Sequence, residues 1–151
     1  MEDYNAAFLR CARDVEVLHE QKRHIAAMHF GGVAIECLLK HMIFTSLPKN
    51  AIKDWYDGSD KTKNYGHTYK NPGHSYNAAL GCLNTVHDGV KRFSAVESWL
   101  NIVERPDGLF IDMRYSGNEP EEEKYTRWYR SYLSLKGWLQ TTGMKTLKKG
   151  R

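Results

Sequence analysis

The sequence predicts an all-α protein, folded as an up-and-down antiparallel bundle of about four to five helices. Apolar side chains recur every three or four residues in several segments, which is the spacing of amphipathic helices. The strict alternation of apolar and polar residues that marks a half-buried strand is not convincing in any segment. The 151 residues suffice for one hydrophobic core, so we expect residues 1–151 to form a single domain.

The first two expected helices occupy residues 5–22 and 24–46. The first has apolar groups along one face, whereas the second is apolar nearly all round, which is typical of the central helix of a bundle. Gly31 and Gly32 lower the helix propensity of this second segment, so we expect a neighbouring helix to approach closely there. Pro48 is expected to end it.

The remaining expected helices follow a long irregular segment, residues 47–73, whose lysines and aromatic side chains suit either a functional or a solvated loop. Residues 74–90 and 94–104 again show the helical spacing of apolar side chains, and a turn-rich connection follows. The last helix is expected to begin near Pro120, because three successive glutamates there suit the positive end of a helix dipole. Its predicted core stripe consists of Tyr125, Trp128, Tyr132, Leu135 and Leu139.

The composition is that of a mildly basic globular protein. The net charge of +4 permits an acidic partner such as RNA or a nucleotide, but does not require one. The three cysteines are odd in number and lack CxxC spacing, so we expect reduced core residues in a cytoplasmic protein. The first residues lack the pattern of a signal peptide, and charged side chains interrupt the longest apolar stretch, so no membrane association is expected.

The stretch "HFGGVAIECLLK", residues 29–40, places three ionisable side chains in the most apolar part of the chain. At about 100° per residue, Glu36 lies within about 20° of His29 around the helix axis, and Lys40 lies about 20° to the other side. These side chains therefore form one narrow stripe. Either Glu36 and Lys40 make an i, i+4 ion pair at a seam between helices, or the stripe lines a polar cleft that binds a ligand or partner.

Three segments resemble, in their order and spacing, the motifs of HEPN domains (higher eukaryotes and prokaryotes nucleotide-binding domains). "AAMHFGGVAIECLLKHMI" resembles the second helix of that family. "NPGHSYNAAL" is similar to its GH-x-L segment, with Tyr76 where leucine is usual. "IDMRYSGNEPEEEKYTRWYRSYL" is similar to its RYP segment before the last helix, with Ser116 in place of proline. The resemblance spans roughly residues 5–142 and implies a helical bundle that is often dimeric.

The resemblance implies several possible functions. Members commonly pair with minimal nucleotidyltransferases, in a toxin–antitoxin-like arrangement, or act as RNases or as RNA- or nucleotide-binding modules. The catalytic branch is marked by an arginine followed, after four to six residues, by a histidine late in the bundle. Here no histidine follows His87, and the pairs with this spacing, Arg13 with His19 and Arg23 with His29, lie too early in the chain. We therefore expect no catalytic residues.

A binding site is the remaining expectation. Its predicted residues are Lys40, His74, Arg114 and Tyr115, together with Glu36 and His29 of the polar stripe. Arg114 would bind phosphate or carboxylate through two hydrogen bonds, and Tyr115 would stack on a base or cap the pocket. His74 stands at an expected helix N-terminus, which favours anions. In the structural alternative, His74 caps its helix and Arg114 pairs with an acidic residue such as Glu36.

No metal or other cofactor is expected. His19, His24 and His29 are five residues apart, so they cannot share one face of a single helix. The predicted function is that of a non-catalytic, homodimeric binding module, which recognises a nucleotide or RNA or partners a minimal nucleotidyltransferase. The alternatives are a metal-independent RNase with a degenerate site and a purely structural interaction protein.

Overall fold

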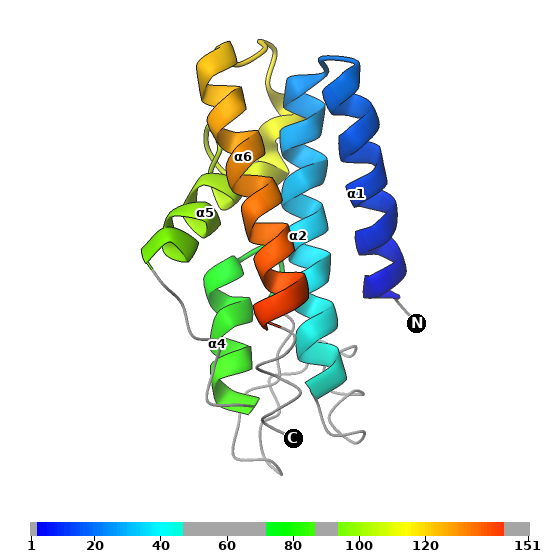
Figure 1. Cartoon of the computed structure of the whole chain (residues 1–151), viewed down its shortest axis with the longest axis vertical. Helices are drawn as coiled ribbons and strands as arrows, with labels where there is room; N and C mark the ends of the chain where they lie inside the picture. Colours follow the sequence, from blue (N-terminus) through cyan, green and yellow to red (C-terminus); the bar gives the residue numbers. More distant parts are fainter. Residues whose placement is uncertain (1–2, 47–71, 87–93, 144–151) are drawn as a thin grey trace.

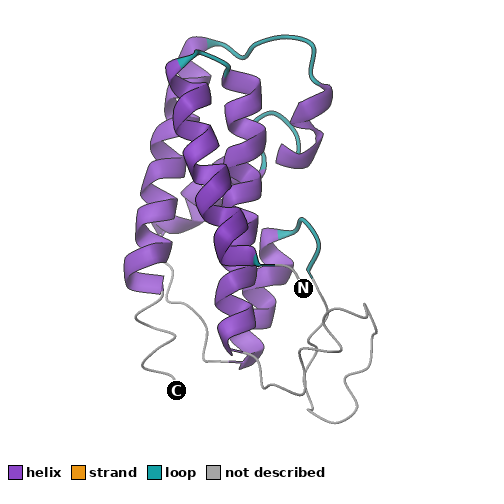
Figure 2. Ribbon diagram, turned by 90° about the vertical axis from the view of Figure 1, so that its right-hand side faces the viewer, coloured by secondary structure: helices purple, strands orange, loops and turns teal. Residues whose placement is uncertain are grey.

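The computed structural model describes residues 3–46, 72–86 and 94–143, and all regular structure within these ranges is helical (Figure 2). The expected all-α class is therefore confirmed. The predicted loop at 47–73 lies, apart from its last two residues, outside the described residues.

Helices α1 (Tyr4–Glu20) and α2 (His24–Ser46) form an antiparallel hairpin (Figure 1). Asp3 caps α1, because its Oδ1 accepts a hydrogen bond of 2.9 Å from the backbone N–H of Ala6. The turn between the helices contains Lys22 at a φ of 57°, a left-handed conformation that reverses the chain within a few residues. This hairpin places the apolar face of α1 against α2.

Helix α6 (Glu122–Trp138) packs on the other side of α2 and runs in the same direction (Figure 1). The order of contacts shows the direction, since Tyr125 stacks on His24 and Trp128, further along α6, lies against Gly31. This parallel pair differs from a simple up-and-down order, so the antiparallel arrangement that we expected is not confirmed. A π-helical turn, η3 (Leu139–Gly143), continues α6.

Helices α4 (Tyr76–Val86) and α5 (Ser94–Glu104) complete the described bundle together with the 3₁₀ helix η2 (Phe110–Tyr115). Two side chains fix the start of α4. Ser75 Oγ accepts a hydrogen bond of 3.1 Å from Ala78 N, and Glu104 accepts one of 2.7 Å from Tyr76 N. Helix η2 lies within the connection that we expected to be only turn-rich.

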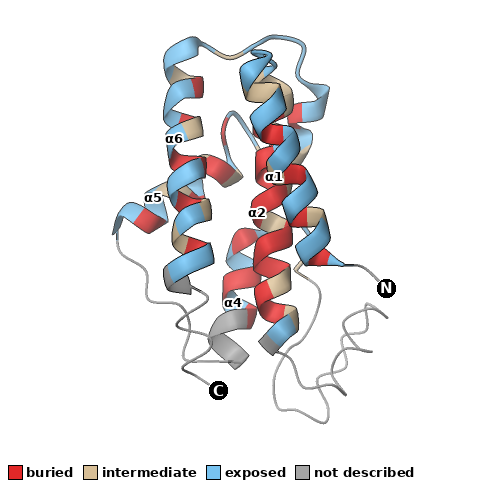
Figure 3. Ribbon diagram, turned by 45° about the vertical axis from the view of Figure 1, so that its right-hand side comes forward, coloured by how far each residue is buried: buried red, intermediate tan, exposed pale blue. Residues whose placement is uncertain are grey.

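The hydrophobic core surrounds α2 (Figure 3). The predicted stripe of α6 is buried along its whole length, and the three cysteines are buried free thiols, as expected for core residues. Residues 24–45 are long and apolar enough to cross a membrane by length and composition, with a mean hydropathy of 1.2. The rest of the protein buries 67% of the most apolar part of this helix, so α2 packs as a core helix in the described structure.

The paired glycines of α2 permit the close approaches that we predicted for them. A Cβ on Gly31 would lie 2.5 Å from the Trp128 ring, so α6 packs directly on the α2 backbone there. A Cβ on Gly32 would lie 2.2 Å from Phe110 Cγ. The neighbour of Gly32 is therefore the 3₁₀ helix η2, which the sequence did not predict.

Candidate functional site

Glu36 is the centre of a polar cluster at the junction of α2 with the start of α4. Its Oε2 accepts a hydrogen bond of 3.3 Å from Lys40 Nζ, and its Oε1 contacts His74 Nδ1. The side chains of Lys40 and Glu36 are only 9% and 11% exposed, whereas that of His74 is 52% exposed. The predicted i, i+4 pair is thus formed, and the segment before α4 adds a histidine at the edge of this cluster.

His29, the third member of the polar stripe, is tied to η2 instead. Its Nδ1 lies 3.0 Å from the carbonyl oxygen of Phe110, which can only accept, so Nδ1 carries the proton and donates. The Phe110 ring in turn meets the His74 ring edge-on, with centroids 6.3 Å apart. Phe110 therefore links His29 to His74 and joins α2, η2 and the start of α4.

Arg114 and Tyr115 lie at the far end of η2. The Arg114 guanidinium carbon lies 4.8 Å from the centroid of the Tyr115 ring, and Tyr115 is 75% exposed. Within the part of the chain that the structure describes, Arg114 makes no ion pair, so the predicted alternative of a pair with Glu36 is not formed. The structure thus joins Glu36, Lys40 and His74 directly, and His29 through Phe110.

The alternative role of His74 as a helix cap is also not observed, because Ser75 and Glu104 hold the first N–H groups of α4. His74 instead uses Nδ1 for Glu36, which orients its ring. Its Nε2 has no hydrogen-bond partner among residues 3–46, 72–86 and 94–143. The histidine therefore presents one nitrogen to solvent from a fixed position.

Burial around Glu36 suppresses the acidity of two neighbouring groups. Burial, reinforced by the Glu36 carboxylate, raises the pKa of the Cys37 thiol to about 12. Burial likewise raises the pKa of the Tyr76 hydroxyl, which donates to the carbonyl oxygen of Gly32 at 2.7 Å. Both groups stay protonated near neutral pH, so neither supplies an activated nucleophile.

Sequence reasoning missed a histidine–tyrosine stack at the α1–α2 turn. His24 stacks on Tyr125 with centroids 3.6 Å apart, and His19 stacks on Tyr129 at 3.7 Å. His19 Nδ1 also lies 2.7 Å from the Tyr125 hydroxyl. His19 and His24 both contact tyrosines of α6 because a turn separates the two histidines. The angular argument assumed a single helix and did not consider such a turn. Among the described residues, no group of three or more potential ligands could hold a metal ion.

Sequence reasoning also missed an open groove between α5 and α6, with a volume of about 1120 Å³. Trp99 of α5 lines one side, and polar residues between 121 and 134 line the other, including Arg127 and Arg130 of α6. The signal in the sequence was the spacing of these two arginines, which places them on one helical face away from the core stripe.

We found no match for this chain among family models, curated proteins or solved structures.

Proposed function

We propose that this protein is a HEPN-like, non-catalytic module that binds the phosphate and base of a nucleotide or of RNA. The observation that carries the proposal is the Arg114–Tyr115 pair, a guanidinium without a carboxylate partner among the described residues, held over an exposed aromatic ring. The motifs that resemble HEPN domains include both of these residues and His74.

The chemistry of the pair suits such a ligand. An arginine guanidinium binds phosphate through two parallel hydrogen bonds, and a tyrosine ring offers a stacking surface to any base. Because 75% of the Tyr115 surface is exposed, the ring is accessible to a ligand. Glu36 holds the His74 ring in orientation through Nδ1. In the protonated ring Nε2 is also a donor, and it would then supply a second hydrogen bond to an anionic group.

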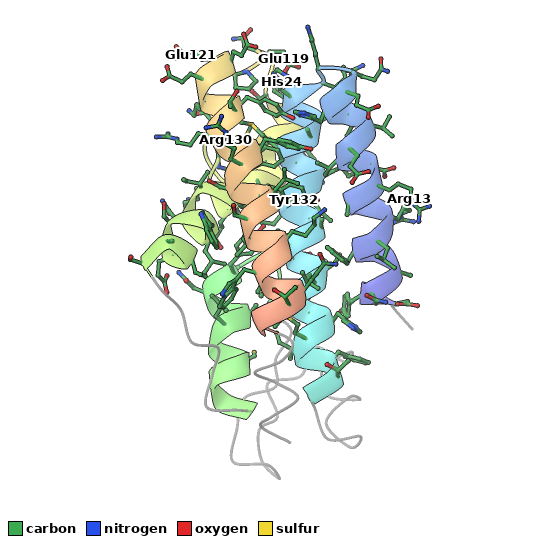
Figure 4. The ribbon with its side chains drawn as sticks, viewed as in Figure 1. Arg13, His24, Glu119, Glu121, Arg130 and Tyr132 are labelled. Carbon is green, nitrogen blue, oxygen red and sulfur yellow. The ribbon has the colours of Figure 1, made fainter. Side chains whose placement is uncertain are left out.

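Binding assays with defined probes test this proposal. AMP, ATP and a fluorescein-labelled oligouridylate would be titrated into the wild-type protein and into Arg114→Gln, Tyr115→Leu and His74→Gln variants. We expect Arg114→Gln to weaken binding of at least one probe by about tenfold or more, equivalent to about 1.4 kcal/mol. Arg13→Gln is the matched control, since Arg13 projects outward from α1 (Figure 4). Equal binding by both variants, or no binding of any probe to the wild type, would contradict the proposal.

The enzyme alternative has its own test. Labelled RNA would be incubated with the wild-type protein and with Arg114→Gln, in the presence of a chelator. Cleavage by the wild type that disappears in the variant would favour a metal-independent RNase.

The homodimer, the nucleotidyltransferase partner and the cytoplasmic location remain predictions. Sedimentation of the pure protein and the gene neighbourhood would test the first two.

A further inference from the structure

The groove between α5 and α6 has a segregated pattern of charge. Carboxylates at 121–123 line the end nearest the start of α6, Arg127 and Arg130 follow, and the hydroxyls of Ser131 and Ser134 lie further along. From residue 121 to residue 134, at 1.5 Å per residue, this pattern extends for about 20 Å. In Figure 4, Glu121 lies at the end of α6 and Arg130 projects from α6 on the side of α5.

These charges are not neutralised within the described part of the protein. Lys124 is engaged, because its Nζ donates to Asp107 Oδ1 at 2.8 Å. By contrast, Glu123 and Arg127 are four residues apart on α6 but form no ion pair, and Arg130 forms none with any described residue. The groove therefore presents unpaired charge of both signs to whatever enters it.

We infer that this groove is a docking site for a polypeptide segment of a partner protein. The segment carries carboxylates that meet Arg127 and Arg130, and a large apolar side chain that packs on Trp99. This interaction is separate from the nucleotide site that we propose at Arg114, and it does not depend on that proposal.

Three features of the groove favour a polypeptide over other occupants. Its volume of about 1120 Å³ lies above the range of roughly 300–1,000 Å³ that is typical of small-molecule pockets. A polynucleotide carries negative charge along its whole length, so it would meet the carboxylates at 121–123 as well as the arginines. A polypeptide can instead place its carboxylates at Arg127 and Arg130 alone. Arginine and tryptophan are the side chains that most often dominate protein–protein binding energy, and here they line the same groove.

Display of random peptides on phage, with the full-length protein as bait, tests the inference. We expect enriched peptides that contain acidic residues together with an aromatic or large aliphatic residue. Synthetic copies should bind the wild-type protein and lose at least about tenfold in affinity, equivalent to about 1.4 kcal/mol, against Arg127→Glu/Arg130→Glu. A peptide with lysines in place of its acidic residues should recover binding to that double variant. Trp99→Leu should weaken binding several-fold.

The chain offers a matched control in Arg10→Glu/Arg13→Glu, which reverses two exposed arginines three residues apart on α1 with the same change in net charge. This control should bind the peptides as the wild type does. Circular dichroism checks that each variant is folded. Peptides that bind the groove variant undiminished, or the absence of any enriched peptide, would overturn the inference.

Two further measurements separate this inference from the nucleotide proposal. Arg114→Gln should leave peptide binding unchanged, and Arg127→Glu/Arg130→Glu should leave the binding of AMP, ATP and oligouridylate unchanged. If oligouridylate binding is instead lost in the groove variant, the groove binds nucleic acid and the docking inference is wrong.

Discussion

Gly32 lies directly against Phe110: a Cβ at Gly32 would lie 2.2 Å from Phe110 Cγ and 2.4 Å from its Cβ. The same short stretch of backbone accepts a hydrogen bond from Tyr76, whose ring stacks on Phe110 at 5.4 Å. The absence of a side chain at Gly32 therefore allows η2 and the start of α4 to pack together on α2. This contact fixes the base of the helix that carries Arg114.

Replacing Gly32 by alanine should destabilise the protein by about 1–3 kcal/mol, because the added methyl group overpacks the contact with Phe110. Urea unfolding followed by circular dichroism measures the loss. Gly137→Ala is the matched control, since Gly137 lies on exposed α6 surface with nothing within 4 Å of its added Cβ. The control should gain up to about 1 kcal/mol from helix propensity. Equal effects of the two substitutions would show that the Gly32 contact is not tight.

The Glu36–Lys40 pair should behave as a buried ion pair. Glu36→Gln should lower the free energy of unfolding by about 3 kcal/mol or more, because it leaves the Lys40 ammonium without its carboxylate partner. Lys40 is buried, with only 7% of its surface exposed. Replacing both residues, as Glu36→Leu/Lys40→Met, should cost clearly less than Glu36→Gln alone. A double-mutant cycle with the single variants Glu36→Leu and Lys40→Met, measured by urea unfolding, gives the coupling energy. Strictly additive losses would mean that the pair is solvated rather than buried.

His41 should make stability depend on pH. Partial burial lowers the pKa of His41 below its ordinary value of 6.5, although Asp3 opposes this shift. The folded state then binds fewer protons than the unfolded state. The stability that the neutral His41 side chain preserves is therefore fully present above about pH 6.5, and it is lost as the pH falls below that value. Unfolding free energies at about pH 7.5 and about pH 5.5 should differ less in His41→Asn than in the wild type. An unchanged difference would exclude His41 as a source.

The Cys37 thiol should be nearly inert in the folded protein. Its pKa of about 12, against an ordinary value of 9.0, reduces the thiolate fraction by about a thousandfold, and burial restricts access further. Alkylation by iodoacetamide, located by mass spectrometry, should therefore modify Cys37 slowly in buffer and rapidly in concentrated urea. Equal rates in the two conditions would show that the Cys37 environment is open in solution.

Local spacing was enough to predict the helices. Residues 94–104 form a helix with the predicted bounds, and the stripe from Tyr125 to Leu139 is buried as expected, because both follow from the period of the α-helix. The i, i+4 pair of Glu36 and Lys40 was predictable for the same reason. Helix η2 was not, because a 3₁₀ helix of six residues has no long periodic pattern, and its packing on Gly32 stabilises it from outside the segment.

By itself, the sequence determined the helical class, the central position of α2, and the presence of ionisable side chains on it, since these depend on residue type and on spacing within one helix. Only the tertiary structure decided that His74, not Arg114, meets Glu36, and that Trp99 comes to line a groove with Arg127 and Arg130. Such contacts join residues from different helices, and their relative positions are set by how the whole core packs. No periodicity within a single segment contains that information.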